Sequence, residues 1–418
     1  MLKRLFFVAL LFTSNVYGQI EEVRRITKQL CSPEFHGRGY VNKGDSLAAD
    51  YLVSEFQKLG VEGYENTFFQ NFTLDVNTFP GRMSVNIGGK DLVPGKDFSI
   101  DPSSRGGKQT LTPREISGEQ TLDLDYLRRV IGEISSERNG AIVFNYKAAP
   151  KDSIPKIQSI IREVATILPV IEVMTTKFTW SVGRNQSNYP YIQIQDSVYK
   201  SGAPIEYDIE ARLIKNYRSQ NVIGYLPAKK KCAKTVMFTA HYDHLGRMGA
   251  DTYFPGANDN ASGSAMLLTM AKYFKETPSD YNIMFVAFGG EEAGLVGSKY
   301  FVENPLFKLK KIKFLVNLDI MGSGEEGITV VNGTLFKEQF DLLQTINKEE
   351  DLLTKIKIRG PAANSDHYWF TEKGVPAFFI YTMGPNKHYH DIFDEYEALS
   401  FNEYEDITKL LIEFLKRI

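Results

Sequence analysis

The sequence predicts an α/β protein in which a mostly parallel mixed sheet, covered by helices on both faces, is interrupted by an inserted β-rich domain. Two observations predict this class. In the second half of the chain, continuous apolar runs alternate with stretches of helical spacing, which is typical of buried parallel strands joined by helices. Between residues 76 and 214 the pattern changes to short β-like runs separated by Gly and Pro, which indicates a separate unit.

The composition is that of a folded, water-soluble protein. The 418 residues are 43% hydrophobic and 24% charged, with 49 Lys and Arg against 51 Asp and Glu. This balance lacks the excess of basic residues by which proteins bind polyanions, so we expect no nucleic-acid partner. At ~100 to 200 residues per domain, the length allows two or three domains.

The first 18 residues have the shape of a signal peptide. A basic start is followed by an apolar run over residues 5–12 and by small residues up to Gly18. This run is far shorter than the ~20 residues that span a bilayer. We therefore predict cleavage near Gly18 and a secreted or periplasmic protein without a membrane span. In such a compartment Cys31 and Cys232, the only cysteines, could form one disulfide bond.

A helix and a strand are predicted before the insert. Residues 45–59 repeat apolar residues at helical spacing and stop at Gly60, which predicts an amphipathic helix. Residues 66–74 are rich in Phe and Thr and read as a strand. We expect both to pack on the sheet of the second half, so that the insert interrupts one domain.

The insert itself contains two apolar runs, at 140–146 and 166–174, that are typical of buried strands. Its Gly-Gly pairs and prolines mark turns between such strands. The predicted division is a signal peptide over 1–18, one domain over 19–75 and 215–418, and an inserted β-rich domain over 76–214.

Five apolar runs predict the strands of the main sheet. Helical stretches lie between several of them, and a last one, over residues 403–418, ends the sequence. The five runs span residues 221–227, 235–240, 282–288, 313–318 and 375–381.

Acidic and imidazole side chains follow four of these runs. Because ligands bind beyond the carboxyl ends of the strands in open α/β sheets, we expect these side chains to converge at one edge. In chain order they are His241, Asp243 and His244, then Glu291 and Glu292, then Asp319, and finally His388, His390 and Asp394. Asp259 precedes the helix after the 235–240 run and joins the same group.

Taken singly, each of these residues has an ordinary explanation, since a Glu before a helix usually caps it and a lone His is usually a surface residue. Together they form a set of His, Asp and Glu without Cys, which favours zinc or a similar divalent metal. Two metals ~3.5–4 Å apart need one shared carboxylate. We predict that His241 and Asp319 hold one ion, that Glu292 and His390 hold the other, and that Asp259 bridges them.

The remaining carboxylates have supporting roles in this prediction. Glu291 and Glu292 are adjacent and point in different directions, so Glu291 is free to act as general base toward a water activated by the metals. Asp243 lies two residues beyond His241 and is predicted to orient its ring. Asp394 is predicted to do the same for His390.

Six motifs carry a resemblance to a known family. They are HYDHLG from His241, GANDNASG from Gly256, FGGEEAGLVGS from Phe288, NLDIMG from Asn317, SDHYWF from Ser365 and YHDIFDEYE from Tyr389. In this order and spacing the sequence resembles the secreted co-catalytic dizinc aminopeptidases, a family of the aminopeptidase Y and bacterial leucyl aminopeptidase type. Glutamate carboxypeptidases and glutaminyl-peptide cyclotransferases are related to it. The resemblance covers residues 20–75 and 215–418.

The resemblance implies a zinc exopeptidase fold and hydrolysis of the N-terminal bond of peptides or proteins. It implies two zinc ions held by His241, Asp259, Glu292, Asp319 and His390, with Glu291 as base, Asp243 in support and a cis peptide bond after Asp259. Residues 76–214 lie where many members carry a protease-associated domain.

Three other functions remain as alternatives: a glutaminyl-peptide cyclotransferase with one zinc, a carboxypeptidase of the same family, and a non-catalytic binding module. Cyclotransferases tend to lack the GAxDNxSG motif and to carry Trp before the last His. In this sequence Asn258, Asn260, Gly294 and Tyr389 instead favour a hydrolase. A binding module has no need of the complete set of base and ligands.

Two assignments within the site stay open. His244 and His388 stand beside the proposed ligands, and the motifs H-x-D and H-x3-D-x2-E favour His241 and His390 over them. Some relatives stabilise the oxyanion with a Tyr shortly before the SDH motif, which is missing from 358–364. Tyr381 and Arg359 are the candidates for that role.

Overall fold

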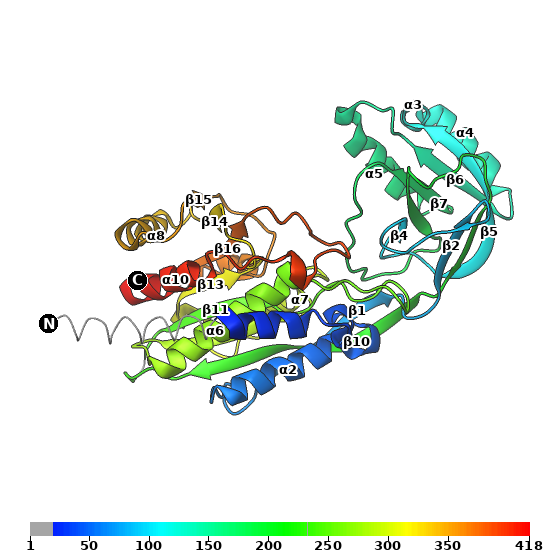
Figure 1. Ribbon diagram of the computed structural model, residues 1–418. Helices are drawn as coiled ribbons and strands as arrows, with labels where there is room; N and C mark the ends of the chain where they lie inside the picture. The colour runs from blue at the N-terminus through cyan, green and yellow to red at the C-terminus, as the bar shows by residue number, and fades with distance from the viewer. Residues whose placement is uncertain (1–19, 232) are drawn as a thin grey trace.

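Two eight-stranded sheets, built from different parts of the chain, carry the fold (Figure 1). This computed structural model describes residues 20–231 and 233–418. The predicted signal peptide and Cys232 lie outside the described residues. With helices on both faces of the first sheet, the structure confirms the predicted α/β class. No helix within the described residues combines the length and apolar character needed to cross a bilayer.

The first sheet has the order β1-β10-β12-β11-β13-β16-β14-β15. Its central strands β12, β11, β13 and β16 run parallel, and β10 and β14 pair antiparallel at their outer sides. All five predicted apolar runs correspond to strands of this sheet. The strands are β1 (Phe69–Thr78), β10 (Arg212–Leu226), β11 (Thr235–His241), β12 (Asn282–Phe288), β13 (Ile312–Leu318), β14 (Gly327–Val331), β15 (Ile356–Ile358) and β16 (Ala377–Met383).

Both faces of this sheet are covered, which explains why its strands read as continuous apolar runs. Every residue of β11 is buried. Alternate residues face opposite layers: Phe238 packs with one helical layer and Met237 with the other. The first layer consists of residues 20–30, α2 (Gly44–Lys58), α6 (Gly263–Glu276), α8 (Lys337–Glu350) and α10 (Tyr404–Arg417). The second layer consists of α7 (Val296–Glu303) and α9 (His367–Glu372).

The second sheet has the order β3-β2-β9-β5-β6-β7-β8-β4, with β5 to β8 parallel. The apolar runs at 140–146 and 166–174 correspond to its strands β6 and β7. Its strands are β2 (Met83–Ile87), β3 (Lys90–Asp91), β4 (Phe98–Ile100), β5 (Gly107–Ser117), β6 (Gly140–Asn145), β7 (Val170–Met174), β8 (Tyr191–Gln195) and β9 (Ile205–Ile209).

Three helices also belong to this region, which is therefore less purely β than the sequence analysis predicts. Helix α4 buries Leu127, Val130 and Ile134, and α5 buries Ile157 and Ile161, at the i, i+3, i+4 and i+7 spacing of amphipathic helices. Their bounds are α3 (Gly118–Leu122), α4 (Leu124–Ser135) and α5 (Ile154–Val164).

Strands β1 and β10 connect the two sheets. They pair antiparallel from Phe69 opposite Val222 to Thr78 opposite Arg212, and the second sheet lies beyond their far end (Figure 1). Residues 76 and 214 fall inside these strands, so we propose the long ladder between β1 and β10 as the boundary of the insert. The remaining short helical segments are η1 (Pro33–Arg38), η2 (Val41–Lys43), η3 (Lys151–Ser153), η4 (Ala257–Ser262), η5 (Leu309–Lys311) and η6 (Tyr396–Ala398).

Candidate metal centre

The candidate site lies at the carboxyl edge of the four central parallel strands. His241 is the last residue of β11, Glu291 and Glu292 follow β12 after two glycines, and Asp319 follows β13 directly. His390 lies in the loop after β16. Parallel strands end at the same edge of a sheet, which is why residues far apart in the sequence meet here.

Asp259 comes from η4, the segment between β11 and α6. The peptide bond between Asp259 and Asn260 is cis, which confirms that expectation. The Asn260 side chain donates to Leu318 O and accepts from the backbone N–H of Gly263. These bonds tie η4 to the end of β13 and place the Asp259 carboxylate over the strand ends.

One group of potential metal ligands consists of His241, Asp259 and Asp319. The Nε2 atom of His241 lies 3.2 Å from Asp259 Oδ1 and 3.4 Å from Asp319 Oδ1. Ligands ~2.0–2.1 Å from one tetrahedral ion lie ~3.3 Å from each other, so these separations suit zinc. All three residues are buried, and Asp319 Oδ1 has no hydrogen-bond partner among the described residues.

The second group uses the other oxygen of Asp259. His390 Nε2 lies 3.1 Å from Asp259 Oδ2 and 3.2 Å from Glu292 Oε2. The Asp259 carboxylate thus faces one set of ligand atoms with Oδ1 and the other set with Oδ2. A carboxylate in this position is what a bridged pair of metal ions requires.

His244 also lies at the second group, although its spacing in the sequence argues against it. Its Nδ1 is 2.7 Å from Glu292 Oε1, and it forms a possible metal-binding group with Glu292 and Asp259. The buried Nε2 of His244 has no partner among the described residues. The exposed His388 instead lies near Asp391, with 3.5 Å between Nδ1 and Oδ1. His244 is therefore a potential ligand or a partner of Glu292 that the motif could not reveal.

The charges of this cluster shift its proton affinities. Burial disfavours the charged form of His390, but the carboxylates of Glu292 and Asp259 outweigh this effect and raise its pKa to about 11. Burial and the neighbouring carboxylates of Asp366, Glu292 and Asp319 raise the pKa of Glu291 well above its usual value. Without metal, the site thus holds protons that cations would displace.

Glu291 differs from Glu292 in its contacts. Its backbone N–H donates to Asp243 Oδ1 at 3.1 Å, while its carboxylate makes no hydrogen bond or ion pair with any described residue. Both glutamates line a cavity of about 420 Å³. The Glu291 carboxyl group is therefore free to exchange a proton with a molecule in that cavity.

Part of the wall of this cavity is apolar and aromatic. It is formed by Leu295, Ile320, Phe379, Tyr381 and Tyr389. Arg359 also lines the cavity, and its Nη1 donates to the Tyr381 hydroxyl at 3.4 Å. Both candidates for oxyanion stabilisation thus lie at the cavity.

Two supporting roles differ from the predictions. Asp394 does not contact the His390 ring; its carboxylate accepts from the backbone N–H groups of Asn258 and Asp259. The His241 ring is held by the carbonyl oxygen of Asp243, 3.1 Å from Nδ1, while the nearest carboxylate oxygen of Asp243 is 4.0 Å away. Both carboxylates accept from backbone N–H groups, which provides buried loops with the hydrogen-bond partners that their main chain needs.

The SDH motif reaches the site through its serine. Ser365 donates to Asp319 Oδ2 at 3.0 Å and accepts from the Asn317 side chain. Asp366 and His367 are buried, but neither lines the cavity. Nothing in the sequence indicated that the serine of this motif, rather than its aspartate or histidine, would contact a proposed ligand.

Arg38 is a second residue that the sequence analysis missed. Its side chain is completely buried and donates five hydrogen bonds to main-chain carbonyls around the site. The acceptors are the carbonyls of Leu30, Tyr242, Pro255, Gly256 and Asp259. The glycines on either side of Arg38 are the feature of the sequence that could have indicated this role. A Cβ on Gly39 would come within 2.4 Å of Gly246 Cα, so only glycine lets this segment approach the loop after β11 so closely.

Replacing Arg38 by Met is expected to lower the free energy of unfolding by about 3 kcal/mol or more. The change leaves several buried carbonyls without a donor, which costs more than the loss of an ordinary hydrogen bond. Arg82→Met is the control, because Arg82 is 66% exposed and pairs with Asp208 at the surface, where such pairs contribute little. Urea unfolding followed by circular dichroism measures both; equal midpoints would contradict this role for Arg38.

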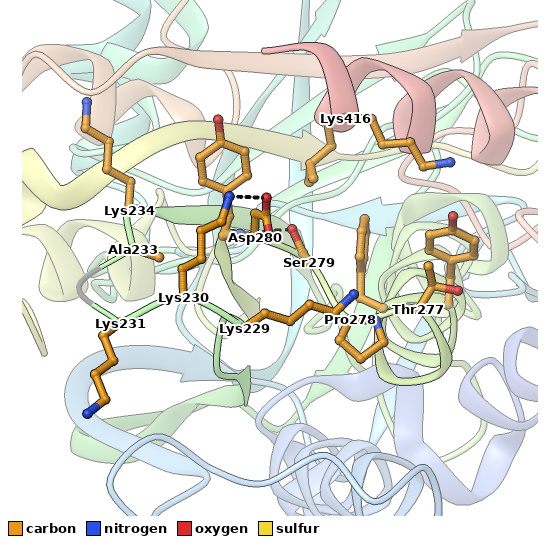
Figure 2. A pocket seen from close by; sticks show the side chains of 14 residues that line it. Lys229, Lys230, Lys231, Ala233, Lys234, Thr277, Pro278, Ser279, Asp280 and Lys416 are labelled. Carbon is orange, nitrogen blue, oxygen red and sulfur yellow. Dashed lines mark hydrogen bonds and ion pairs between the residues drawn. The ribbon is translucent and has the colours of Figure 1, made fainter.

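A larger cavity, of about 640 Å³, lies elsewhere and has no such cluster (Figure 2). It is lined by the basic run Lys229 to Lys231, together with Lys234 and Lys416. Figure 2 shows Lys231 and Lys234 extending away from the other lining residues. Lys230 pairs with Asp280 at 2.5 Å. These features fit the solvent-exposed turn expected for a charged run.

Comparison with known proteins gives a family match over part of the chain. Residues 221–415 match the model of peptidase family M28. Aminopeptidase YwaD of Bacillus subtilis is 41% identical over 231 residues, which cover 51% of this chain and 48% of YwaD. Leucine aminopeptidase 1 of Arthroderma otae is 26% identical over 263 residues, which cover 56% of this chain and 68% of that protein. The part of this chain that aligns with YwaD thus spans about half of the length of YwaD.

Solved structures resemble the fold over almost its whole length. The zinc aminopeptidase BSAP of Bacillus subtilis aligns with a TM-score of 0.68 at 20% identity and covers 94% of this chain and 93% of its own. An aminopeptidase from Aneurinibacillus sp. strain AM-1 aligns with a TM-score of 0.64 at 17% identity, over 95% and 93% of the two chains. At these identities the likeness concerns the fold, and it extends over both sheets.

Proposed function

We propose that this chain is a zinc aminopeptidase of peptidase family M28, whose model matches residues 221–415, and that it hydrolyses the N-terminal bond of peptides or proteins. The observation that carries the proposal is the Asp259 carboxylate, whose two oxygens face two separate sets of ligand atoms. YwaD and BSAP are named aminopeptidases, and BSAP a zinc aminopeptidase. We further propose that residues 1–18 direct its export.

The proposed ligands fit two zinc ions. His241 and Asp319 would hold one ion, Glu292 and His390 the other, and Asp259 both. Three carboxylates and two neutral imidazoles, with separations of 3.1 to 3.4 Å between facing atoms, suit the charge and radius of zinc. When bound, zinc supplies Lewis acidity toward the scissile carbonyl and the attacking water.

The chain's own residues handle the proton. In the proposed reaction Glu291 takes a proton from the attacking water and delivers it to the leaving amine, because its carboxylate is unengaged and lines the same cavity as the ligands. Asp243 supports this role by holding the Glu291 backbone N–H. The apolar wall beside Phe379 and Tyr389 accommodates the side chain of the first substrate residue.

A substrate panel with elemental analysis tests the proposed function. We expect about two zinc ions per chain, as the co-catalytic arrangement requires, and turnover of aminoacyl nitroanilides. One zinc with cyclisation of Gln-initiated peptides would favour a glutaminyl-peptide cyclotransferase. Release of C-terminal residues from N-terminally blocked peptides would favour a carboxypeptidase. Zinc-free protein without any turnover would leave only a binding module.

Zinc affinity is expected to rise with pH between about pH 6 and 8. The pKa of His390 is raised to about 11 by Glu292 and Asp259 against the effect of burial, so its ring is protonated in the metal-free protein. Zinc must displace that proton, and protons compete less as pH rises. Calorimetric titration of the metal-free protein in two buffers of different ionisation enthalpy measures the proton release; an affinity independent of pH would contradict the prediction.

A further inference from the structure

The insert reaches the candidate metal centre through the segment between β7 and β8. The backbone N–H of Trp180 donates to His390 O at 2.9 Å, and His390 Nδ1 lies 2.9 Å from Trp180 O. With Nδ1–H donating to this carbonyl, the neutral ring carries no proton on Nε2. That nitrogen is the atom that faces Asp259 and Glu292.

The Trp180 carbonyl is held in place by the side chain of its own residue. Trp180 is buried, and its Nε1 donates to the carbonyl of Ile100 in β4 at 2.7 Å. Its ring stacks on Phe254 with centroids 4.7 Å apart and an interplanar angle of 14°. Phe254 belongs to the loop between β11 and η4, so the Trp180 ring lies between the insert and the loop that leads to Asp259.

Lys177 binds the loop that carries His390. Its Nζ donates to Lys387 O at 3.0 Å, Tyr389 O at 3.1 Å and Asp391 Oδ2 at 2.7 Å. The Asp391 side chain is 6% exposed, whereas that of Lys177 is 50% exposed. The loop over residues 387–391 has little regular structure of its own, and His390 adopts a positive φ of 53° in it. Its geometry therefore depends on these bonds from the insert.

We propose that residues 177–180 of the insert are a positioning element for the metal ligand His390. The segment fixes both the tautomer and the direction of the ring, so that the insert takes part in metal binding without contributing a ligand. This inference rests on the proposed function only in taking His390 as a zinc ligand. It assigns the insert a role at the Glu292–His390 position and none at the His241–Asp319 position.

Lys177→Met tests the proposal in the full-length zinc protein. In a titration with a chelator, we expect the variant to lose one of its two zinc ions at about 10- to 100-fold lower chelator concentration than the wild type. This is the usual effect of changing a residue that orients a metal ligand. The second zinc should be retained as in the wild type. Lys177→Arg should restore most of the retention, because it keeps the charge facing Asp391. Because the Lys177 side chain is half exposed, the variant is expected to fold.

Lys147→Met is the matched control. Lys147 is also an exposed lysine of the insert, but it pairs with Asp196 of the insert itself at 3.1 Å. Hydrogen exchange of residues 387–391 in the metal-free proteins provides a second readout, with faster exchange expected only in Lys177→Met. Zinc retention equal to wild type in Lys177→Met, or an equal loss in Lys147→Met, would overturn the proposal. Wild-type protein that binds zinc but hydrolyses no aminoacyl substrate would contradict the proposed function alone.

Discussion

Glu291→Gln is expected to retain zinc and to lose about 10²- to 10⁴-fold in kcat on aminoacyl nitroanilides, the usual contribution of a general base. Gln matches Glu in shape but cannot accept the proton of the attacking water. The Glu291 carboxylate has no structural partner among the described residues, and the bond between its backbone and Asp243 does not depend on the side chain. Folding and metal content should therefore be unchanged.

The neighbouring Glu292→Gln is the control for this result. Glu292 faces His390 Nε2 at 3.2 Å and His244 Nδ1 at 2.7 Å, so its replacement should lower zinc content together with kcat. Steady-state kinetics and elemental analysis of the two variants separate a proton-transfer role from a ligand role. A Glu291→Gln enzyme that keeps wild-type kcat would refute the assignment of the base.

Asp259→Asn is expected to lower zinc content below two ions per chain and to reduce kcat by about 10³-fold, since losing Lewis-acid assistance costs several kcal/mol of transition-state stabilisation. An amide offers one oxygen where the carboxylate offers two. The substitution thus removes the atom that serves one of the two ligand sets. It also removes a negative charge that two dications need in a buried site.

Asp251→Asn is the matched control for Asp259→Asn. Asp251 lies in the same connection between β11 and α6 but is exposed, so the same chemical change there should leave zinc content and kcat unaltered. Elemental analysis after gel filtration and nitroanilide kinetics measure both variants. Full zinc content in Asp259→Asn would contradict the bridging assignment.

The sheet and the convergence of the site could be predicted because both follow from simple rules. Runs such as 235–240 and 282–288 are mostly apolar, without alternating polar positions, because both faces of the sheet are covered. Residues that follow such strands must meet at one edge, which brought His241 and Asp319 together without any knowledge of the loops. The helices α4 and α5 also had a readable amphipathic pattern, which the β-like texture around them concealed.

The contacts that hold the site could not be predicted in the same way. The Asp394 carboxylate binds backbone N–H groups of the η4 segment rather than a histidine ring, and backbone donors leave no mark on a sequence. The Trp180 carbonyl reaches His390 across 210 residues from a segment that contains no motif. His244 approaches Glu292 because of how the chain turns after β11, which spacing along the sequence does not encode.

The guanidinium of Arg38 limits how far this chain can be shortened. The stretch that matches the peptidase family begins at residue 221, yet the carbonyls of Tyr242, Pro255 and Gly256 receive their hydrogen bonds from a side chain more than two hundred residues upstream. A fragment cut at the border of the recognised stretch would lack the donor for these groups. A shortened or recombined version of the protein must therefore keep residues 36–40 (HGRGY) together with the strands of the main sheet.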